Sequence, residues 1–334
     1  MTMNRRVYVV TKKKKKKKML RKFIITPLLL LFLAGGAYTA SLYSKAEQVA
    51  NSSFESLDGT DLNEAVLDKT VKNISVLFIG IDDSETRSGA TRSDALILAT
   101  FNKEDNSIKL ISIPRDSYVY VPETGDYTKI NHAYAYGGTK ATIDTVESLL
   151  DIDVDYYVRM NFYAFIDVVD ALGGVKVDVP YDLTEQDSND METITLEAGT
   201  QNLNGEEALA FARTRKQDND MERGKRQQEL IEAIISKATS AQSVTKYANV
   251  LEAIGDNMKT DLTFTQMKIY LSYFLTHSDL SVDSLQLVGS DSTIDDIYYY
   301  QLDEVKLEEM IDLLHAHLNG ETLITEEPEM ASEA

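Results

Sequence analysis

Residues 74–80 read Ile-Ser-Val-Leu-Phe-Ile-Gly, a near-continuous apolar run that ends in a glycine. A strand that is buried on both faces has this pattern, because neither face meets water. The runs at residues 95–101 and 108–113 repeat it, and the polar segment 102–106 between them is typical of a hairpin loop. We therefore expect three strands of a central sheet, the last two of them antiparallel neighbours.

Strands and helices alternate after these runs, and helices dominate towards the C-terminus. Gly173 and Gly174 should end one helix, because glycine adopts the left-handed conformation of a helix C-terminus without strain. The polar segment 181–192 is interpreted as a loop or a short hairpin. The order predicts an α/β fold, with a mixed central sheet and helices on both faces. The predicted strands are 156–160 and 175–179, and the predicted helices are 139–150, 162–171, 205–212, 222–238, 244–258, 265–277 and 302–318.

Composition and charge limit the classes of protein to consider. The chain has 334 residues, 43% of them apolar, which is enough for one enzyme-sized domain. Residues 1–22 carry 11 of the 34 Lys and Arg and none of the 54 Asp and Glu, so residues 23–334 have a formal net charge of −31. Such a body repels nucleic acid phosphates. The absence of cysteine excludes disulfides and thiolate metal sites.

Residues 23–43 contain no charged side chain and are long enough to cross a bilayer as a helix. The seven lysines at residues 12–18 should stay on the cytoplasmic side, which would place the rest of the chain outside the cell. A cleaved signal peptide, with Gly35-Gly36-Ala37 at the cleavage site, is the alternative.

These patterns divide the chain into five predicted regions, from a basic tail to an acidic one. The anchor is followed by a polar, acidic stretch that should form an extracellular stalk with some helix. The regions are a cytoplasmic tail (1–22), a transmembrane signal anchor (23–43), the stalk (44–72), a catalytic domain (73–320) and a disordered acidic tail (321–334).

Aspartate and arginine occur together in four clusters, three of them at predicted strand ends. Loops at strand ends line the ligand crevice of an open α/β sheet, so these clusters predict one site. Arginine binds phosphate oxygens two at a time, and paired carboxylates hold a divalent cation, so the combination indicates a diphosphate site. Taken singly, each cluster could instead be a surface ion pair. The clusters are Gly80 to Asp83, Arg92 to Asp94, Ile113 to Asp116, and Arg213 to Arg215 followed by Asp220 to Gln227.

Spacing within the last cluster predicts which side chains face the same way. Arg223, Arg226 and Gln227 stand at i, i+3 and i+4 and share one helical face. Arg213 and Arg215 would diverge on a helix but point the same way on an extended segment, so the preceding helix should end near Ala212.

Two other groups of residues are expected to be structural. Asn131 is predicted to cap a helix that begins at His132, which makes His132 structural rather than catalytic. The run Tyr298 to Tyr300 could contact sugar, but a strand packed on the core accounts for it better.

Several ordered motifs between residues 74 and 235 resemble the LytR-CpsA-Psr family. The resemblance implies an enzyme that transfers teichoic acid, capsule or a related polymer from polyprenyl diphosphate to peptidoglycan. It also implies magnesium, an apolar tunnel for the lipid, and a lipid pyrophosphatase side activity. The motifs are Gly80 to Asp82, Arg92 to Asp94, Ser112 to Asp116, Lys129 to Tyr134, Asp170 to Val175, and Arg213 to Gln227.

The resemblance also implies roles for individual residues. Asp82 and Asp94 would be the carboxylates associated with magnesium, and Asp220 a candidate base. Gly224 and Lys225 are interpreted as unremarkable variation within a helix. The catalytic residues would be Arg115, Arg213, Arg215, Asp220 and Arg223. The diphosphate would be bound by Arg92, Arg115, Arg213, Arg215, Arg223, Arg226 and Gln227.

Two other functions must be weighed against the enzyme. A DNA-binding regulator is disfavoured by the acidic body and by a topology that places it outside the cell. A non-catalytic wall- or lipid-binding protein, or an envelope-linked regulator, is disfavoured by Asp82 and Asp94, because a passive anion site needs no carboxylates beside its arginines. The expected partners are therefore the membrane, a polyprenyl diphosphate-linked glycan and peptidoglycan, without nucleic acid.

Overall fold

The computed structural model describes residues 43–59, 70–82, 91–217, 220–238, 250, 257–277 and 280–321. The chain forms two compact units, Met1–Glu47 and Gln48–Ala334, and residues 43–47 of the first are helical. The predicted anchor at 23–43 lies outside the described residues apart from Tyr43, as does the predicted acidic tail apart from Glu321. No helix in the described part of the chain is both long and apolar enough to cross a bilayer.

A six-stranded mixed sheet forms the centre of the second unit, and β1 lies inside it as predicted. β1 pairs parallel to β6 and antiparallel to β2, and β2 pairs antiparallel to β3, which confirms the predicted hairpin. β12 runs parallel to β3, and β11 runs antiparallel to β6. In sheet order the strands are β11 (Met258–Thr260), β6 (Tyr156–Asn161), β1 (Ile74–Ile81), β2 (Ser93–Asn102), β3 (Ser107–Ser112) and β12 (Ser281–Gln286).

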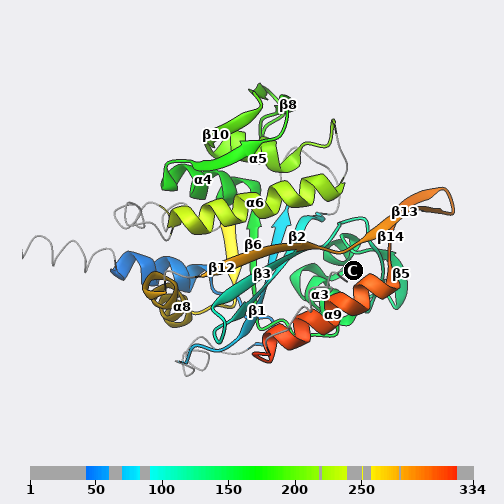
Figure 1. Ribbon diagram of the computed structural model, residues 1–334, viewed down its shortest axis with the longest axis horizontal. Helices are drawn as coiled ribbons and strands as arrows, with labels where there is room; N and C mark the ends of the chain where they lie inside the picture. Colours follow the sequence, from blue (N-terminus) through cyan, green and yellow to red (C-terminus); the bar gives the residue numbers. More distant parts are fainter. Residues whose placement is uncertain are drawn as a thin grey trace, which may run out of the picture. The chain divides into compact units, whose positions relative to one another are not determined.

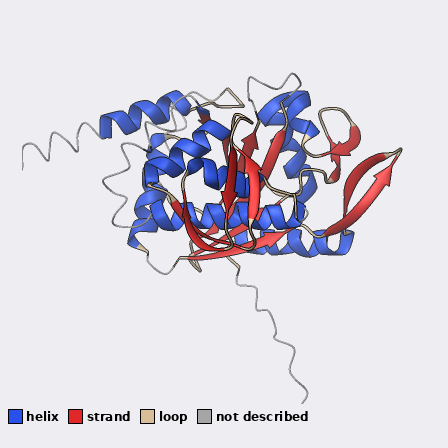
Figure 2. Cartoon of the chain, turned by 90° about the horizontal axis from the view of Figure 1, so that it is seen from above, coloured by secondary structure: helices blue, strands red, loops and turns tan. Residues whose placement is uncertain are grey.

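Helices cover both faces of the sheet, as predicted (Figure 1 and Figure 2). Leu77, Ile79 and Ile81 alternate along β1 into a core shared with α3 (His132–Leu150) and α9 (Glu304–Leu318). The other face packs against α8 (Phe264–Thr276) and α6 (Asp220–Ala238). Burial on both faces is the reason that the sequence of β1 is apolar almost throughout.

A smaller layer packs beyond α6 around its own apolar core, which contains Val177, Phe211 and Leu230. Gly173 has a φ of +77° and its N–H bonds the carbonyl of Asp170, which confirms the predicted glycine cap. The predicted loop or hairpin at 181–192 begins the hairpin of β8 and β9. The layer contains α4 (Phe162–Leu172), β7 (Val175–Val179), β8 (Leu183–Gln186), β9 (Thr193–Leu196), β10 (Gly199–Leu203) and α5 (Gly205–Arg213).

The predicted stalk belongs in part to the folded body. Within the second unit, the N–H of Glu55 donates to the carbonyl of Thr260 at 2.8 Å, and the hydroxyl of Tyr157 donates to the carbonyl of Glu55 at 2.7 Å. The folded body therefore begins before the predicted boundary at residue 73. Polar composition suggested a stalk, but these contacts use backbone groups, which composition does not report.

Other departures follow from glycines, turns and hairpins. The predicted helix 139–150 extends back to His132 across a kink at Gly137 and Gly138, and the side chain of Asn131 makes no capping hydrogen bond, so the cap prediction was wrong. Asn131 already has helical dihedral angles, which do not suit a cap. Most of the helix predicted at 244–258 lies outside the described residues. The strand predicted at Tyr298 to Tyr300 is confirmed, because it lies within β14 and Tyr299 and Tyr300 are buried. Its pairing was not predicted, nor was the other hairpin: β13 (Gly289–Ile294) pairs with β14 (Ile297–Leu302), and β4 (Tyr118–Val121) pairs with β5 (Asp126–Lys129).

Candidate active site

A cavity of about 600 Å³ lies between the sheet and the helices α4, α5 and α6. Its lining divides into an apolar chamber and a group of charged side chains. The apolar side chains of the chamber are Phe78, Ile97, Met160, Phe162, Phe165, Val168, Leu209, Leu230, Ile231, Ile234 and Ile235.

The apolar chamber comes from one face of the sheet and from the helices α4, α5 and α6. Leu230, Ile231, Ile234 and Ile235 recur at the spacing of a single helical stripe. Leu230 and Ile234 also pack against the core of the smaller layer, and Ile231 packs against the sheet. An apolar chamber of this size suits a hydrocarbon chain, because it offers the chain surroundings free of polar groups.

Most of the predicted site residues meet at this cavity although they are spread over more than 140 positions of sequence. Arg92 and Arg226 do not line it, and the side chain of Asp220, the first residue of α6, lies outside what the structure describes. Those that line it are Asp82, Asp94, Arg115, Arg213, Arg215, Arg223 and Gln227.

A β-bulge brings Asp94 to the cavity, where it lies beside the end of β1. The register of β1 and β2 passes from Gly80 opposite Ala95 to Ile81 opposite Ser93, so that Asp94 is the extra residue. A bulge turns a side chain out of the regular alternation, which explains why the neighbours Asp94 and Ala95 both line the cavity. Asp82 follows β1 directly, next to this bulge.

Arg115 is held on two sides. Its guanidinium bonds the carboxylate of Asp94, and its Nε lies 3.6 Å from Oδ2 of Asp116. The backbone is fixed as well, because the N–H of Asn131 donates to the carbonyl of Arg115 at 3.2 Å. A phosphate-binding fork held in this way loses little conformational freedom when it binds.

Arg213 and Arg215 are presented by the end of α5, much as predicted. The helix ends at Arg213, and Thr214 is extended with φ −59° and ψ 141°. Thr214 is buried, whereas both arginines line the cavity. The change from helix to extended chain therefore directs the two arginines to one side.

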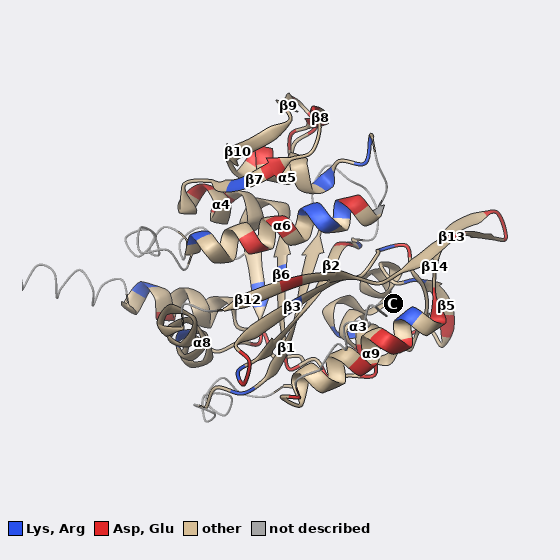
Figure 3. Ribbon diagram, viewed as in Figure 1, with Lys and Arg blue, Asp and Glu red and all other residues tan. Residues whose placement is uncertain are grey.

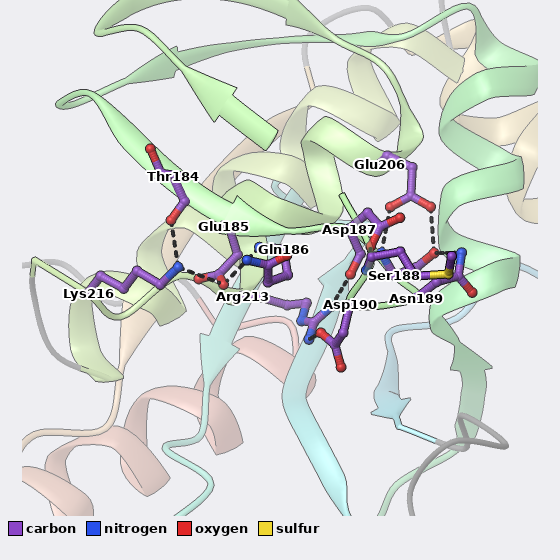
Figure 4. Close-up of polar contacts among 11 residues, drawn as sticks. Thr184, Glu185, Gln186, Asp187, Ser188, Asn189, Asp190, Glu206, Arg213 and Lys216 are labelled. Atoms are coloured by element: carbon purple, nitrogen blue, oxygen red, sulfur yellow. Dashed lines mark hydrogen bonds and ion pairs between the residues drawn. The ribbon is translucent and has the colours of Figure 1, made fainter. Parts of the chain in front are cut away.

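The loop between β8 and β9 holds Arg213 from outside (Figure 4). Nη1 of Arg213 donates to the carbonyl of Asp187 at 3.5 Å, and Nη2 lies 3.9 Å from Oδ1 of Asp190. The loop is tied to α5, because the backbone N–H and the hydroxyl of Ser188 both donate to the carboxylate of Glu206, at 2.9 and 2.5 Å. Backbone hydrogen bonds from Met191 and Glu192 and the nearby Arg213 lower the pKa of Asp187, which keeps the loop anionic.

Lys216 and Glu185 line the cavity and were not predicted. Nζ of Lys216 lies 3.2 Å from Glu185 and donates to the carbonyl of Thr184 at 2.8 Å (Figure 4). Lys216 directly follows the Arg-Thr-Arg motif, which was a usable signal. Glu185 had none, because only the β8–β9 hairpin brings it there.

Arg226 was predicted to bind the diphosphate, but it does not line the cavity and its side chain has partners within the protein. Its side chain is only 3% exposed and donates to the carbonyls of Phe211 and Thr214 and to the hydroxyl of Tyr181. It joins α6 to the end of α5. Helical spacing placed Arg226 near Arg223 but could not distinguish a side chain that faces the cavity from one that faces the neighbouring helix.

Arg92 was also assigned to the diphosphate, and it is exposed outside the cavity. The pKa of His132 is lowered mainly by burial, and the positive charges of Arg92 and Lys129 lower it further. His132 bonds the hydroxyl of Thr128 at 2.9 Å, which agrees with a structural role.

Gly224 has a structural role, contrary to the interpretation as unremarkable variation. A Cβ atom at this position would lie 2.6 Å from Oγ of Ser112 and 2.9 Å from Nε2 of Gln286. The glycine therefore lets α6 approach the sheet closely enough to place Arg223 and Gln227 at the cavity.

The carboxylates of the cavity suit a magnesium ion that is shared with a diphosphate. Within the described residues no group of three or more His, Asp or Glu side chains could hold a metal by itself. Asp82 and Asp94 nevertheless line the cavity beside the arginines. Magnesium is commonly bound by one or two carboxylates together with substrate phosphates and water, so the donor set fits.

Comparisons with known proteins agree with this geometry. The model of the LytR_cpsA_psr family matches residues 37–316. The polyisoprenyl-teichoic acid–peptidoglycan teichoic acid transferase TagT of Bacillus subtilis is 42% identical over 281 residues, which cover 82% of this chain and 86% of TagT. The structure of TagT bound to LI-WTA is 39% identical with a TM-score of 0.62, over 79% of this chain and 95% of that one. The structure of YwtF (TagT) with bound octaprenyl pyrophosphate lipid is 37% identical with a TM-score of 0.59, over 76% and 93%.

Proposed function

This chain belongs to the LytR-CpsA-Psr family, and we propose that it is a phosphotransferase that moves a glycopolymer from a polyprenyl diphosphate carrier to peptidoglycan. One observation carries the proposal: a single cavity joins an apolar chamber to four arginines and two aspartates. A lipid diphosphate has the same two parts, a hydrocarbon chain and a compact anionic group. The transferase names of TagT and related proteins support the reaction.

The proposed reaction is a displacement at the phosphorus nearest the glycopolymer. A hydroxyl of a peptidoglycan sugar attacks this phosphorus, a new P–O bond forms, and the bond to the bridging oxygen breaks. Polyprenyl phosphate leaves with the electron pair of the broken bond, and the hydroxyl proton passes to a base. Asp220 remains the candidate base for this proton.

The arginines make the largest contribution in this proposal. Phosphoryl transfer depends on positioning and on stabilising the negative charge that spreads over the phosphate oxygens. Arg115, Arg213, Arg215 and Arg223 line one cavity and would place their donors around that charge. Each positioned donor contributes about 3 kcal/mol, by analogy with oxyanion sites. Asp82 and Asp94 would hold magnesium, which would neutralise phosphate charge when bound.

The proposed location is the outer face of the cell membrane, with a single anchor at residues 23–43 and the N-terminus in the cytoplasm. The lysine run before the anchor and the requirement for a peptidoglycan acceptor support this orientation. An enzymatic reporter fused after Ala334 should be active only outside the cytoplasm. Activity inside the cytoplasm would contradict the orientation.

The function is tested by transfer of a labelled lipid-diphosphate glycan to peptidoglycan oligomers, with full-length protein in mild detergent. Wild type should transfer the label in the presence of magnesium, and Arg215→Ala should be slower by about two orders of magnitude. Lys225→Ala is the control, because Lys225 is an exposed cation on α6 that does not line the cavity. Donor binding by wild type without transfer to any wall acceptor would favour a lipid-binding protein.

A further inference from the structure

Four tyrosines form a cluster on the β4–β5 hairpin and β14, which we call the tyrosine platform: Tyr118, Tyr120, Tyr127 and Tyr299. The ring centroids of Tyr118 and Tyr127 are 5.5 Å apart, as are those of Tyr120 and Tyr127, and Tyr299 lies 4.8 Å from Tyr118. Alternation along β4 and its register with β5 place Tyr118, Tyr120 and Tyr127 on one face of the hairpin.

The hairpin does not need these rings for its own core. Val119 and Val121 point to the opposite face of β4 and are buried in the main core. Tyr127 is 55% exposed and Tyr120 is 41% exposed. Tyr118 is half-buried, and Tyr299 is buried at 8% exposed and supports the cluster from the strand β14. The exposed part is the neighbouring ring pair of Tyr120 and Tyr127, and contiguous exposed apolar surface marks interaction sites on folded domains.

The tyrosine platform is joined to the loop that carries Arg115. Lys129 lies opposite Tyr118 in the hairpin, and its Nζ is 2.9 Å from Oδ1 of Asp116. The N–H of Tyr300, in the strand that supplies Tyr299, donates to the carbonyl of Asp116 at 2.9 Å. Tyr120 stands only two residues beyond Tyr118, a distance of about 7 Å along a strand. A molecule of a few sugar rings bound here would therefore lie beside Arg115.

Charge favours an uncharged occupant. The turn of the hairpin carries exposed Glu123 and Asp126, while the ammonium of Lys129 is paired with Asp116. Figure 3 shows acidic residues at β5 and at the tip of the β13–β14 hairpin. Carboxylates repel a polyanionic glycopolymer but accept hydrogen bonds from sugar hydroxyls. Aromatic rings offer a flat apolar surface to the C–H face of a sugar ring.

We propose that the tyrosine platform binds the sugar backbone of the peptidoglycan acceptor beside the phosphate site. The proposal rests on the proposed function, because it assigns a surface to the second substrate of that reaction. The arginines and the apolar chamber bind the donor, and the platform binds the acceptor.

The test compares the double variant Tyr120→Ala/Tyr127→Ala with wild type, using full-length protein. The KM for peptidoglycan oligomers should rise about tenfold, which corresponds to about 1.4 kcal/mol, while kcat at saturating acceptor and the KM for the donor stay unchanged. The variant Tyr120→Phe/Tyr127→Phe should keep most of the affinity, because it retains the ring faces. Leu275→Ala is the control, since Leu275 is an apolar side chain that is 46% exposed on α8, outside the tyrosine platform.

A second measurement separates this proposal from the proposed function. Binding of chitohexaose, an uncharged sugar oligomer, is measured by calorimetry in the absence of donor. Wild type should bind it, and the alanine double variant should bind about tenfold more weakly. Lost chitohexaose binding would support the tyrosine platform even if no transfer were detected. A folded alanine variant with unchanged acceptor KM, or with a raised donor KM alone, would overturn the proposal.

Discussion

Substitution by glutamine should impair different properties at Arg226 and at Arg215, although the sequence assigned both residues to the diphosphate. The two variants make the same chemical change at different places. Arg226 is buried and bonds three groups of the protein, whereas Arg215 is exposed and lines the cavity. We expect Arg226→Gln to lose stability and Arg215→Gln to lose transfer.

The magnitudes follow from the contacts. Glutamine is shorter and cannot reach all three acceptors of Arg226, and each hydrogen bond from a charged donor contributes about 1.5–3 kcal/mol. Loss of two of them predicts a destabilisation of about 3–6 kcal/mol, and hence a fall in Tm of about 10 °C for a unit of this size. An exposed substitution such as Arg215→Gln should change stability by less than about 0.5 kcal/mol. Its transfer rate should fall about a hundredfold.

The assay pairs thermal unfolding with the transfer rate, measured well below the lower Tm. Arg226→Gln should recover most of its transfer activity at low temperature, where the folded form dominates. The reasoning would be refuted if Arg226→Gln kept the wild-type Tm and lost transfer as Arg215→Gln does. Arg226 would then bind substrate, in a conformation different from the one described.

Three further predictions concern stability and the cavity wall. Burial and, to a smaller extent, the charge of Lys109 lower the pKa of His317 to about 4. Between pH 6.5 and 4 the unfolded chain therefore binds more protons than the folded one, and the free energy of unfolding should fall by up to about 3 kcal/mol as the pH drops through that range. Burial raises the pKa of Asp261 to about 6, which makes stability vary with pH in the opposite direction. The measurement is therefore the difference in urea midpoint between wild type and His317→Gln as a function of pH. A difference that does not change with pH would contradict the prediction. Gly224→Ala should destabilise the protein by about 1–3 kcal/mol despite the better helix propensity of alanine, because its Cβ would collide with Ser112. Denaturant unfolding measures this, with Lys225→Ala as the control. A stabilised Gly224→Ala variant would show that α6 can move away from the sheet. Glu206→Gln should raise the donor KM roughly three- to tenfold with little change in kcat, because the loop that holds Arg213 loses the carboxylate that bonds Ser188. Glu308→Gln on α9 is the matched control. An unchanged donor KM would mean that the loop is held without Glu206.

The sequence alone determined the central sheet and the chemical class of the site. The run at 74–80 is apolar because β1 is buried on both faces, and such a local pattern needs no knowledge of the partner elements. The end of α5 was also readable, since Arg213 and Arg215 can point together only from extended chain. Clusters of arginine and aspartate indicated a diphosphate because their side-chain chemistry does not depend on the fold.

Only the tertiary structure decided which charged residues meet at the cavity. Helical spacing treats Arg223 and Arg226 alike, and both side chains are buried. Packing of α6 against α5 ties Arg226 to backbone carbonyls, whereas Arg223 lines the cavity. The bulge that turns Asp94 into the cavity depends on the register of two strands. The hairpins that supply Glu185 and the tyrosine platform have weak local patterns, and their positions are fixed by contacts with distant residues, such as that of Tyr300 with Asp116. A sequence pattern reports the environment along one element, whereas a site is made where several elements meet.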